Sequence, residues 1–224
     1  MKTYNLPKNA KVLIFDIDST LYTCPEYAHE QIDAQVRHFA KIRGFSADEA
    51  RKMVADFRRK WAAEHDGQKI SLGNLLVSFG VSIEQSIEWR KMLFDPADYL
   101  THDEKLVDSI QKLSRFFYII CVTNNPVLPA RRTLEVLGIS DFVQKIVGLD
   151  TCLASKPSIK ILQKAIEFAK IATNEEIAFE NCISVGDRFD IDLKLPIECG
   201  MGGILVDGVK DVYEMPNLLL NRAE

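Results

Sequence analysis

Two groups of aspartates in this chain each follow a short apolar run. Asp16 and Asp18 come directly after one run, and Asp187 and Asp192 follow another. Carboxylates that lie close together repel one another and resist ionisation unless a cation offsets their charge. A cluster of carboxylate oxygens without histidine or thiolate favours a hard ion, and Mg²⁺ is the usual occupant. The two groups therefore predict a Mg²⁺ site if the fold brings them together.

Further polar residues occupy comparable positions. Thr123 and Asn124 follow a third apolar run, and Lys156 precedes a helical pattern. A lysine ammonium supplies a positive charge for phosphate oxygens, and a threonine hydroxyl supplies a hydrogen-bond donor. Together with Mg²⁺, this combination suits phosphoryl transfer, in which positioning and charge neutralisation are most of the task.

The apolar runs themselves predict the strands that carry these groups. They do not alternate with polar residues, which is typical of strands buried on both faces. They are Val12–Phe15, Phe116–Val122, Lys145–Gly148, Cys182–Val185 and Gly203–Val206. Helical patterns at 129–137 and 157–172 lie between the later runs, so we predict an α/β fold with a doubly wound parallel sheet. Because ligands bind beyond the carboxyl ends of such strands, the polar groups should converge on one site.

The stretch between the first and second predicted strands interrupts this alternation with helices alone. Two capping boxes, Ser46 with Glu49 and Ser82 with Gln85, indicate helix starts within it. A crossover between parallel strands needs only one helix, so several helices indicate a separate bundle. We therefore predict an all-α cap inserted into the core. The predicted boundaries are residues 1–22 and 100–224 for the core and 23–99 for the cap.

Composition excludes several other classes of protein. The chain has 28 Lys and Arg against 32 Asp and Glu, a net charge of −4 that offers no field for a nucleic-acid polymer. The longest apolar run, Phe116–Val122, is too short to span a membrane. Five cysteines without a C-x-x-C pair indicate a reducing compartment. We expect a cytoplasmic monomer or homodimer whose partner is a small molecule, with no membrane or nucleic-acid partner.

Four segments, in order along the chain, resemble the signatures of the haloacid dehalogenase superfamily. FDIDSTLY at 15–22 is similar to the first, hydrophobic-D-x-D-x-T, and GDRFDID at 186–192 is similar to the fourth. Thr123 and Lys156 match the second and third at the expected spacing. The helical stretch between the first two signatures resembles the α-helical, or C1-type, cap of that superfamily.

The resemblance implies a role for each signature residue. Asp16 would be the nucleophile that forms an aspartyl-phosphate, and Asp18 would protonate the leaving alcohol and then accept a proton from water. Thr123 and Lys156, with backbone amides near Asn124, would hold the phosphoryl oxygens.

The resemblance also implies a set of Mg²⁺ ligands. These would be the Asp16 carboxylate, the backbone carbonyl of Asp18 and the carboxylate of Asp187, with Asp192 close by or bridging through water. Thr20 would brace the loop that carries the first two aspartates.

The reaction class depends on Asp18. Dehalogenases of the superfamily lack a carboxylate at that position, because a departing halide needs no proton. Its presence implies a Mg²⁺-dependent phosphomonoester hydrolase. Ser19 departs from the glycine or asparagine common at the next position.

The substrate class rests on a narrower resemblance. Tyr22, DYL at 98–100 and TNNP at 123–126 resemble pyrimidine 5′-nucleotidase-like members, which implies a nucleoside 5′-monophosphate. Alternatives are a sugar phosphate or phosphoglycolate-type substrate, a phosphomutase, or a non-catalytic regulatory protein on the same fold.

Several neighbouring residues have two interpretations. Tyr22 and Tyr27 either stack on a base or pack within the cap, and Asn125 and Arg188 belong either to the site or to the surface. We expect Asp190 to be a solvated residue at a helix start.

Overall fold

The five apolar runs predicted as strands all contribute to one sheet. The computed structural model describes residues 1–67 and 69–220, and within them the sheet has six strands in the order β1-β6-β5-β2-β3-β4. The strands are β1 (Lys2–Tyr4), β2 (Val12–Phe15), β3 (Tyr118–Val122), β4 (Lys145–Val147), β5 (Cys182–Gly186) and β6 (Gly202–Leu205).

The sheet is parallel except at one edge. β2 lies between β3 and β5, and Phe15 is opposite both Cys121 and Val185, so these three strands end within one residue of one another. β1 pairs antiparallel with β6. The predicted doubly wound α/β sheet is confirmed, and this short antiparallel strand is a correction to its all-parallel form.

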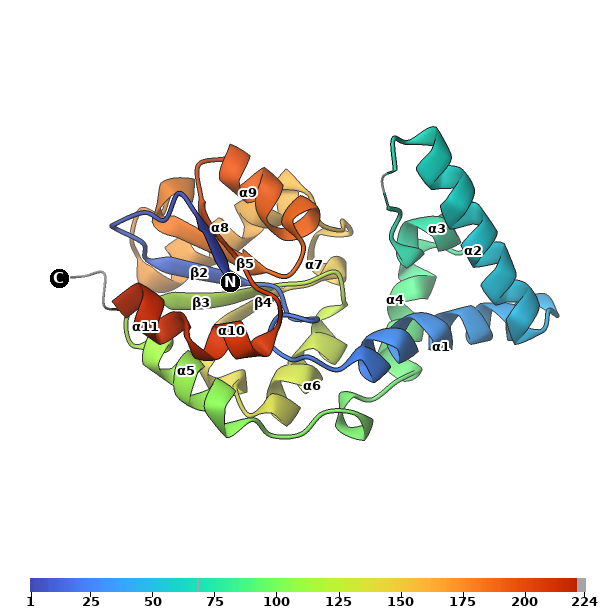
Figure 1. Cartoon of the computed structure of the whole chain (residues 1–224), viewed down its shortest axis with the longest axis horizontal. Coiled ribbons are helices and arrows are strands. Elements are labelled where there is room, and N and C mark those ends of the chain that lie inside the picture. The colour runs from blue at the N-terminus through green and yellow to red at the C-terminus, as the bar shows by residue number, and fades with distance from the viewer. Residues whose placement is uncertain (68, 221–224) are drawn as a thin grey trace. The chain divides into compact units, whose positions relative to one another are not determined.

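Helices cover both faces of the sheet (Figure 1). α8 and α9 lie on one face, and α5, α6, α10 and α11 lie on the other. Apolar side chains of α8 pack with those of β2, β3 and β4 into a buried cluster. The helices of this unit are α5 (Glu104–Ser114), α6 (Val127–Leu137), α7 (Leu149–Cys152), α8 (Ile159–Thr173), α9 (Lys194–Glu198), α10 (Val209–Tyr213) and α11 (Met215–Leu220). Single turns are η1 (Pro96–Asp98), η2 (Ser140–Phe142), η3 (Phe179–Asn181) and the π-helical η4 (Phe189–Leu193).

Two helix starts differ from the sequence patterns. α6 begins at Val127 instead of Pro129, because Pro126 takes the N-cap position. α8 begins at Ile159, after the turn that contains Lys156. Gly138 ends α6 in the left-handed conformation at φ 84°, which a glycine adopts without steric cost.

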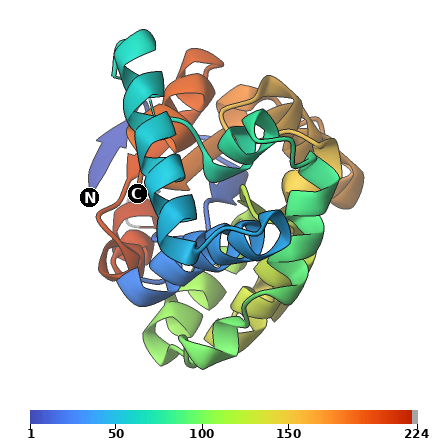
Figure 2. The same ribbon diagram turned by 90° about the vertical axis from the view of Figure 1, so that its right-hand side faces the viewer.

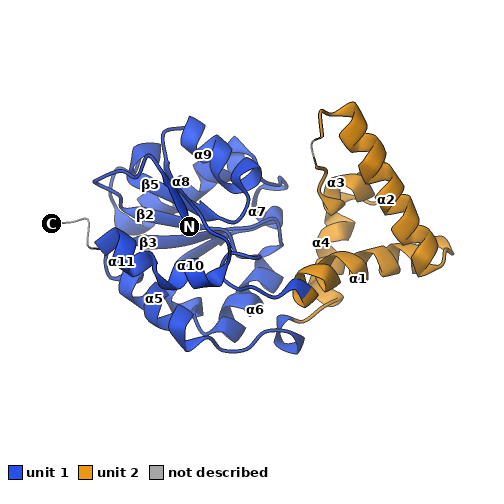
Figure 3. Ribbon diagram, viewed as in Figure 1, with its two compact units in different colours: residues 1–25, 96–224 blue, residues 26–95 orange. Residues whose placement is uncertain are grey.

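The chain divides into two compact units (Figure 3). One contains residues 1–25 and the chain from Pro96 onward, and the other contains residues 26–95. The predicted cap, residues 23–99, extends slightly beyond the second unit at both ends. Among the described helices, none has both the length and the apolar character that crossing a membrane requires.

The second unit is made of helices packed around their own apolar core (Figure 2). They are α1 (Pro25–Arg43), α2 (Ala47–Glu64), α3 (Leu72–Ser78) and α4 (Ile83–Met92). The two predicted capping boxes are confirmed, since Ser46 and Glu49 bond reciprocally at the start of α2, and Ser82 and Gln85 at the start of α4.

A buried aspartate links the first two helices of this unit. Asp33 of α1 accepts hydrogen bonds from Arg37 and from the Nε and Nη2 atoms of Arg51 in α2, the latter two at 2.8 Å. The hydrogen bonds from Arg51, helped by Arg37, lower the pKa of Asp33 to about 2 against partial desolvation. A carboxyl group with a depressed pKa stabilises the folded state above its unfolded pKa and loses that contribution as the pH falls.

We expect Asp33→Asn to lower the free energy of unfolding by about 1 kcal/mol at neutral pH, since the half-exposed arginines are partly screened. The difference from wild type should shrink as the pH falls from about 5 towards 2, where Asp33 itself protonates. Asp56→Asn is the control, because Asp56 pairs with Arg59 at the exposed surface of α2. Denaturant titrations measure both variants, and equal effects at neutral pH would contradict the prediction.

Candidate active site

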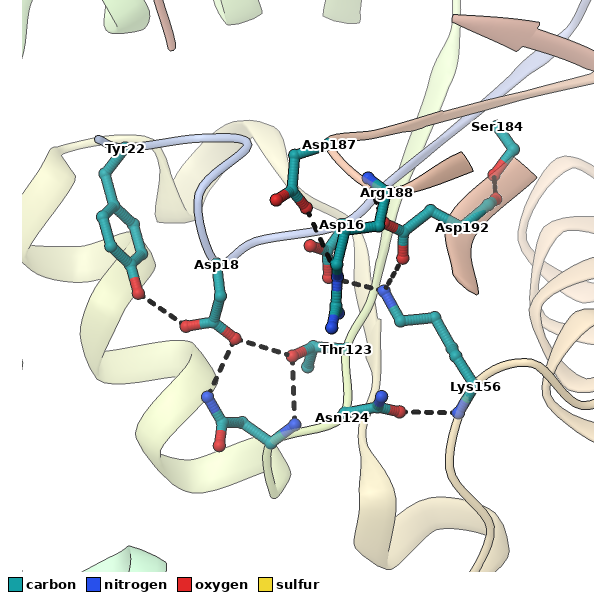
Figure 4. A network of polar contacts seen from close by, with 11 residues as sticks. Asp16, Asp18, Tyr22, Thr123, Asn124, Lys156, Ser184, Asp187, Arg188 and Asp192 are labelled. Carbon is teal, nitrogen blue, oxygen red and sulfur yellow. Dashed lines mark hydrogen bonds and ion pairs between the residues drawn. The ribbon is translucent and has the colours of Figure 1, made fainter. Parts of the chain in front are cut away.

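Polar residues from three adjacent strand ends meet at one edge of the sheet (Figure 4). Asp16 follows β2, Thr123 follows β3 and Asp187 follows β5. The backbone N–H of Asp16 donates to the carbonyl of Val185, and that of Thr123 donates to the carbonyl of Val147. The sheet ladder thus continues to the site residues and holds their backbone in place.

Lys156 forms buried ion pairs with two carboxylates of this group. Its Nζ is 2.5 Å from Asp16 Oδ1 and 2.7 Å from Asp192 Oδ1, and the three side chains are at most 7% exposed. Burial alone would lower the pKa of Lys156, but Asp16 and Asp192 raise it above its usual value. The lysine is therefore held as a cation between two carboxylates.

The carboxylates carry more negative charge than this one lysine offsets. Burial raises the pKa of Asp16, and Asp192 and Asp18 add to that rise against the effect of Lys156. Burial and Asp192 likewise raise the pKa of Asp187. A further cation would relieve both groups.

Three of these carboxylates have the arrangement of a cation site. Oxygens of Asp16, Asp187 and Asp192 all lie within 4.8 Å of one another. Asp16 Oδ2 and Asp187 Oδ1 are buried, and neither has a hydrogen-bond partner among the described residues. Unsatisfied buried carboxylate oxygens are costly, and a hard divalent ion is a common reason for them. The donor set therefore fits Mg²⁺.

Asp192 differs from the other two because both of its oxygens are occupied. Oδ1 contacts Lys156, and Oδ2 accepts from the backbone N–H of Arg188 at 3.0 Å. Its carbonyl accepts from Ser184 Oγ at 2.7 Å. A Cβ at position 186 would lie 2.3 Å from the Asp192 Cβ, so only glycine allows this approach. The glycine of the fourth segment is thus explained by close packing.

Asp18 has its own set of partners beside the cluster. Tyr22 Oη donates to Asp18 Oδ1 at 2.6 Å, and Asn125 Nδ2 donates to Oδ2 at 2.9 Å. Thr123 Oγ1 is 3.4 Å from the same Oδ2. Asn125 therefore belongs to the site. Its position in the sequence alone did not decide between the site and the surface.

Three further residues predicted from the sequence lie beside the cluster or at the surface. The side chain of Asn124 accepts from the backbone N–H of Lys156 at 2.6 Å, which ties the third signature to the second. Arg188 lies near the carboxylates, and although burial lowers its pKa, Asp192, Asp16 and Asp187 raise it overall. Asp190 is exposed, as expected.

The expectation for Thr20 is corrected, and one interpretation of the two tyrosines is favoured. The Thr20 hydroxyl is buried without a hydrogen-bond partner among the described residues, so it does not brace the loop by a side-chain bond. Of the two interpretations of the tyrosine rings, their burial favours packing over stacking on a base, since Tyr22 is 3% exposed and Tyr27 is 1% exposed and packs edge-on against Phe94.

The backbone conformation at Ser19 accounts for the glycine or asparagine that is common at this position in the family. Its φ is 63°, in the left-handed region that these two residues adopt most readily. The turn between Asp18 and Thr20 thus carries some backbone strain in this chain.

The acidic cluster and the buried Lys156 thus lie together at the carboxyl ends of parallel strands. The haloacid dehalogenase-like hydrolase family matches residues 10–200. The chain belongs to this family of enzymes. A comparison with curated protein sequences found no match.

Solved structures share the fold at low sequence identity. A HAD (haloacid dehalogenase) phosphatase from Thermococcus onnurineus has a TM-score of 0.61 at 18% identity, covering 93% of this chain and 97% of the other. A HAD-superfamily hydrolase of subfamily IA from Geobacter sulfurreducens gives 0.60 at 13%, covering 94% and 100%. YfnB from Bacillus subtilis, bound to magnesium, gives 0.58 at 15%, covering 93% and 99%.

Proposed function

We propose that this hydrolase is a Mg²⁺-dependent phosphatase that cleaves a phosphomonoester through an aspartyl-phosphate on Asp16. The observation that carries the proposal is the Asp18 carboxylate, which lies within hydrogen-bond reach of the phosphate-binding candidate Thr123. Release of an alkoxide requires a proton donor, whereas release of a halide does not. A carboxyl group at this position therefore favours a phosphomonoester over a haloacid.

The chain's own residues account for both half-reactions. Asp16 attacks phosphorus, the bond to the ester oxygen breaks, and Asp18 gives its proton to the departing alkoxide. Water then attacks the phosphoryl group and returns a proton to Asp18, which frees Asp16 and inorganic phosphate. Lys156 and Thr123 hold the phosphoryl oxygens during both steps.

Mg²⁺ would be held by the carboxylates of Asp16 and Asp187 and the carbonyl of Asp18, with Asp192 nearby. When bound, it neutralises charge on the phosphoryl oxygens. Asp16 Oδ2 and Asp187 Oδ1 support this assignment, because both are buried and accept no hydrogen bond within the described residues, although Arg188 Nε lies 3.8 Å from Asp187 Oδ1. The magnesium in the Bacillus subtilis structure is compatible with it.

A pyrimidine nucleoside 5′-monophosphate is the substrate class that we favour. The support is the resemblance of Tyr22, residues 98–100 and residues 123–126 to pyrimidine 5′-nucleotidase-like members. A sugar phosphate or phosphoglycolate, a mutase reaction and a non-catalytic role are the alternatives. They differ in product: another free alcohol, an isomerised sugar phosphate, or no product.

The experiment that tests the reaction class measures two products in parallel. The purified protein is incubated with Mg²⁺ and either p-nitrophenyl phosphate or 2-chloropropionate, and released phosphate and chloride are quantified. We expect phosphate and no chloride. Chloride release at a comparable rate would contradict the assignment of Asp18.

We expect Asp187→Asn to weaken Mg²⁺ binding by at least about tenfold, because it removes the charge of one of the proposed carboxylate ligands. We expect added Mg²⁺ to raise the melting temperature of wild type and to raise that of this variant far less. Asp190→Asn is the matched control, since it removes an exposed carboxylate three residues away. An unchanged Mg²⁺ response in Asp187→Asn would refute this ligand assignment.

A further inference from the structure

The Tyr22 hydroxyl has a place in the site that the signature residues do not explain. Tyr22 lies four residues after Asp18 and is 3% exposed, and its Oη is 2.6 Å from Asp18 Oδ1. We propose that Tyr22 and Asn125 form a clamp, a pair of positioning residues that hold the Asp18 carboxyl group in the orientation needed for proton transfer to the leaving group. This inference rests on the proposed phosphatase function and assigns a role to two residues outside its core chemistry.

The clamp engages both oxygens of one carboxyl group. Tyr22 reaches Oδ1, and the Asn125 side-chain amide reaches Oδ2 at 2.9 Å. The two donors come from different segments, since Tyr22 lies in the loop after β2 and Asn125 in the loop after β3. With a donor on each oxygen, rotation of the carboxyl group would break at least one hydrogen bond.

Both donors are themselves anchored. The Asn125 backbone N–H donates to Thr123 Oγ1 at 3.1 Å, and its carbonyl accepts from the N–H of Leu149 at 2.9 Å. Tyr22 follows a turn in which the N–H of Leu21 donates to the carbonyl of Ile17 at 2.9 Å. These contacts tie the orientation of Asp18 to the segments that follow β2, β3 and β4. Asp16 and Thr123 directly follow two of the same strands, β2 and β3.

A simpler explanation is that a buried tyrosine hydroxyl merely needs an acceptor. The two explanations differ in their kinetic consequence. A displaced proton donor slows only those steps that need its proton, and a small misplacement can cost on the order of 10²-fold. A purely structural hydrogen bond affects all substrates alike.

The test compares two leaving groups in Tyr22→Phe. p-Nitrophenolate departs without protonation, whereas the alkoxide of UMP or glycerol 3-phosphate requires it. The measured quantity is kcat/KM, which reports the first half-reaction and excludes the later use of Asp18 as a base. We expect the ratio of alkyl to aryl kcat/KM to fall at least about tenfold in Tyr22→Phe, and to fall in the same direction in Asn125→Ala.

Tyr213→Phe is the matched control, because the Tyr213 hydroxyl also donates to an aspartate, Asp103, at 2.5 Å but away from the site. It should leave the ratio unchanged. An unchanged ratio in Tyr22→Phe, with wild type active on both esters, would overturn the clamp and leave the phosphatase proposal intact. Absence of phosphate release by wild type would instead contradict the phosphatase proposal.

A crystal structure of Tyr22→Phe tests the clamp independently of activity. We expect the Asp18 carboxyl group to occupy a different or a second rotamer once the hydrogen bond from Tyr22 is lost. An Asp18 side chain that keeps the wild-type rotamer in a single conformation would overturn the clamp whatever the enzyme's substrate.

Discussion

Asp16→Asn is expected to reduce phosphate release by about 10⁴-fold or more, because the amide cannot form the covalent intermediate. The substitution preserves the side-chain shape and removes a charge that burial already disfavours. The fold should therefore persist, which circular dichroism and the melting temperature would verify. No label should transfer from a ³²P-labelled ester to the variant protein.

Asp190→Asn serves as the control for this variant as well. It changes an exposed aspartate of η4 by the same chemistry and should keep wild-type turnover. Turnover by Asp16→Asn within tenfold of wild type would remove the covalent mechanism from consideration.

Lys156→Met is expected to affect both stability and activity. It leaves Asp16 and Asp192 buried without their shared cation, and breaking a buried ion pair on one side costs about 3 kcal/mol or more. Loss of a phosphate-binding charge should also lower kcat/KM by at least about 10²-fold. Denaturant titration in EDTA measures the stability loss, and added Mg²⁺ should restore part of it.

Lys164→Met provides the comparison, since Lys164 pairs with Glu167 on the exposed side of α8. Its free energy of unfolding should stay within about 0.5 kcal/mol of wild type. If Lys156→Met had the same free energy of unfolding as wild type in EDTA, the buried ion pair would not stabilise the fold.

The sequence predicts those elements of the fold that local residue patterns determine. The runs at 12–15 and 182–185 are apolar without alternation, and both are central strands. Capping boxes depend on residues three positions apart, so they could be identified without tertiary information. β1 could not, because Lys2–Tyr4 has no apolar run and forms a strand only through its pairing with β6.

The site could be anticipated only in part for the same reason. Residues that directly follow parallel strands share an edge by topology, so the grouping of Asp16, Thr123 and Asp187 follows from their sequence positions. The contacts of Tyr22 and Asn125 with Asp18 depend on how two loops orient their side chains. No periodic pattern encodes that orientation, so both residues had two interpretations until the structure placed them.

Phosphate release measured with and without Mg²⁺ would decide whether this protein is a Mg²⁺-dependent phosphatase. Wild-type protein would be freed of metal with EDTA, then assayed across nucleoside 5′-monophosphates, sugar phosphates and phosphoglycolate. We expect release that requires added Mg²⁺ and is highest with UMP or CMP. Full activity in EDTA, or no release from any ester with Mg²⁺ present, would contradict it.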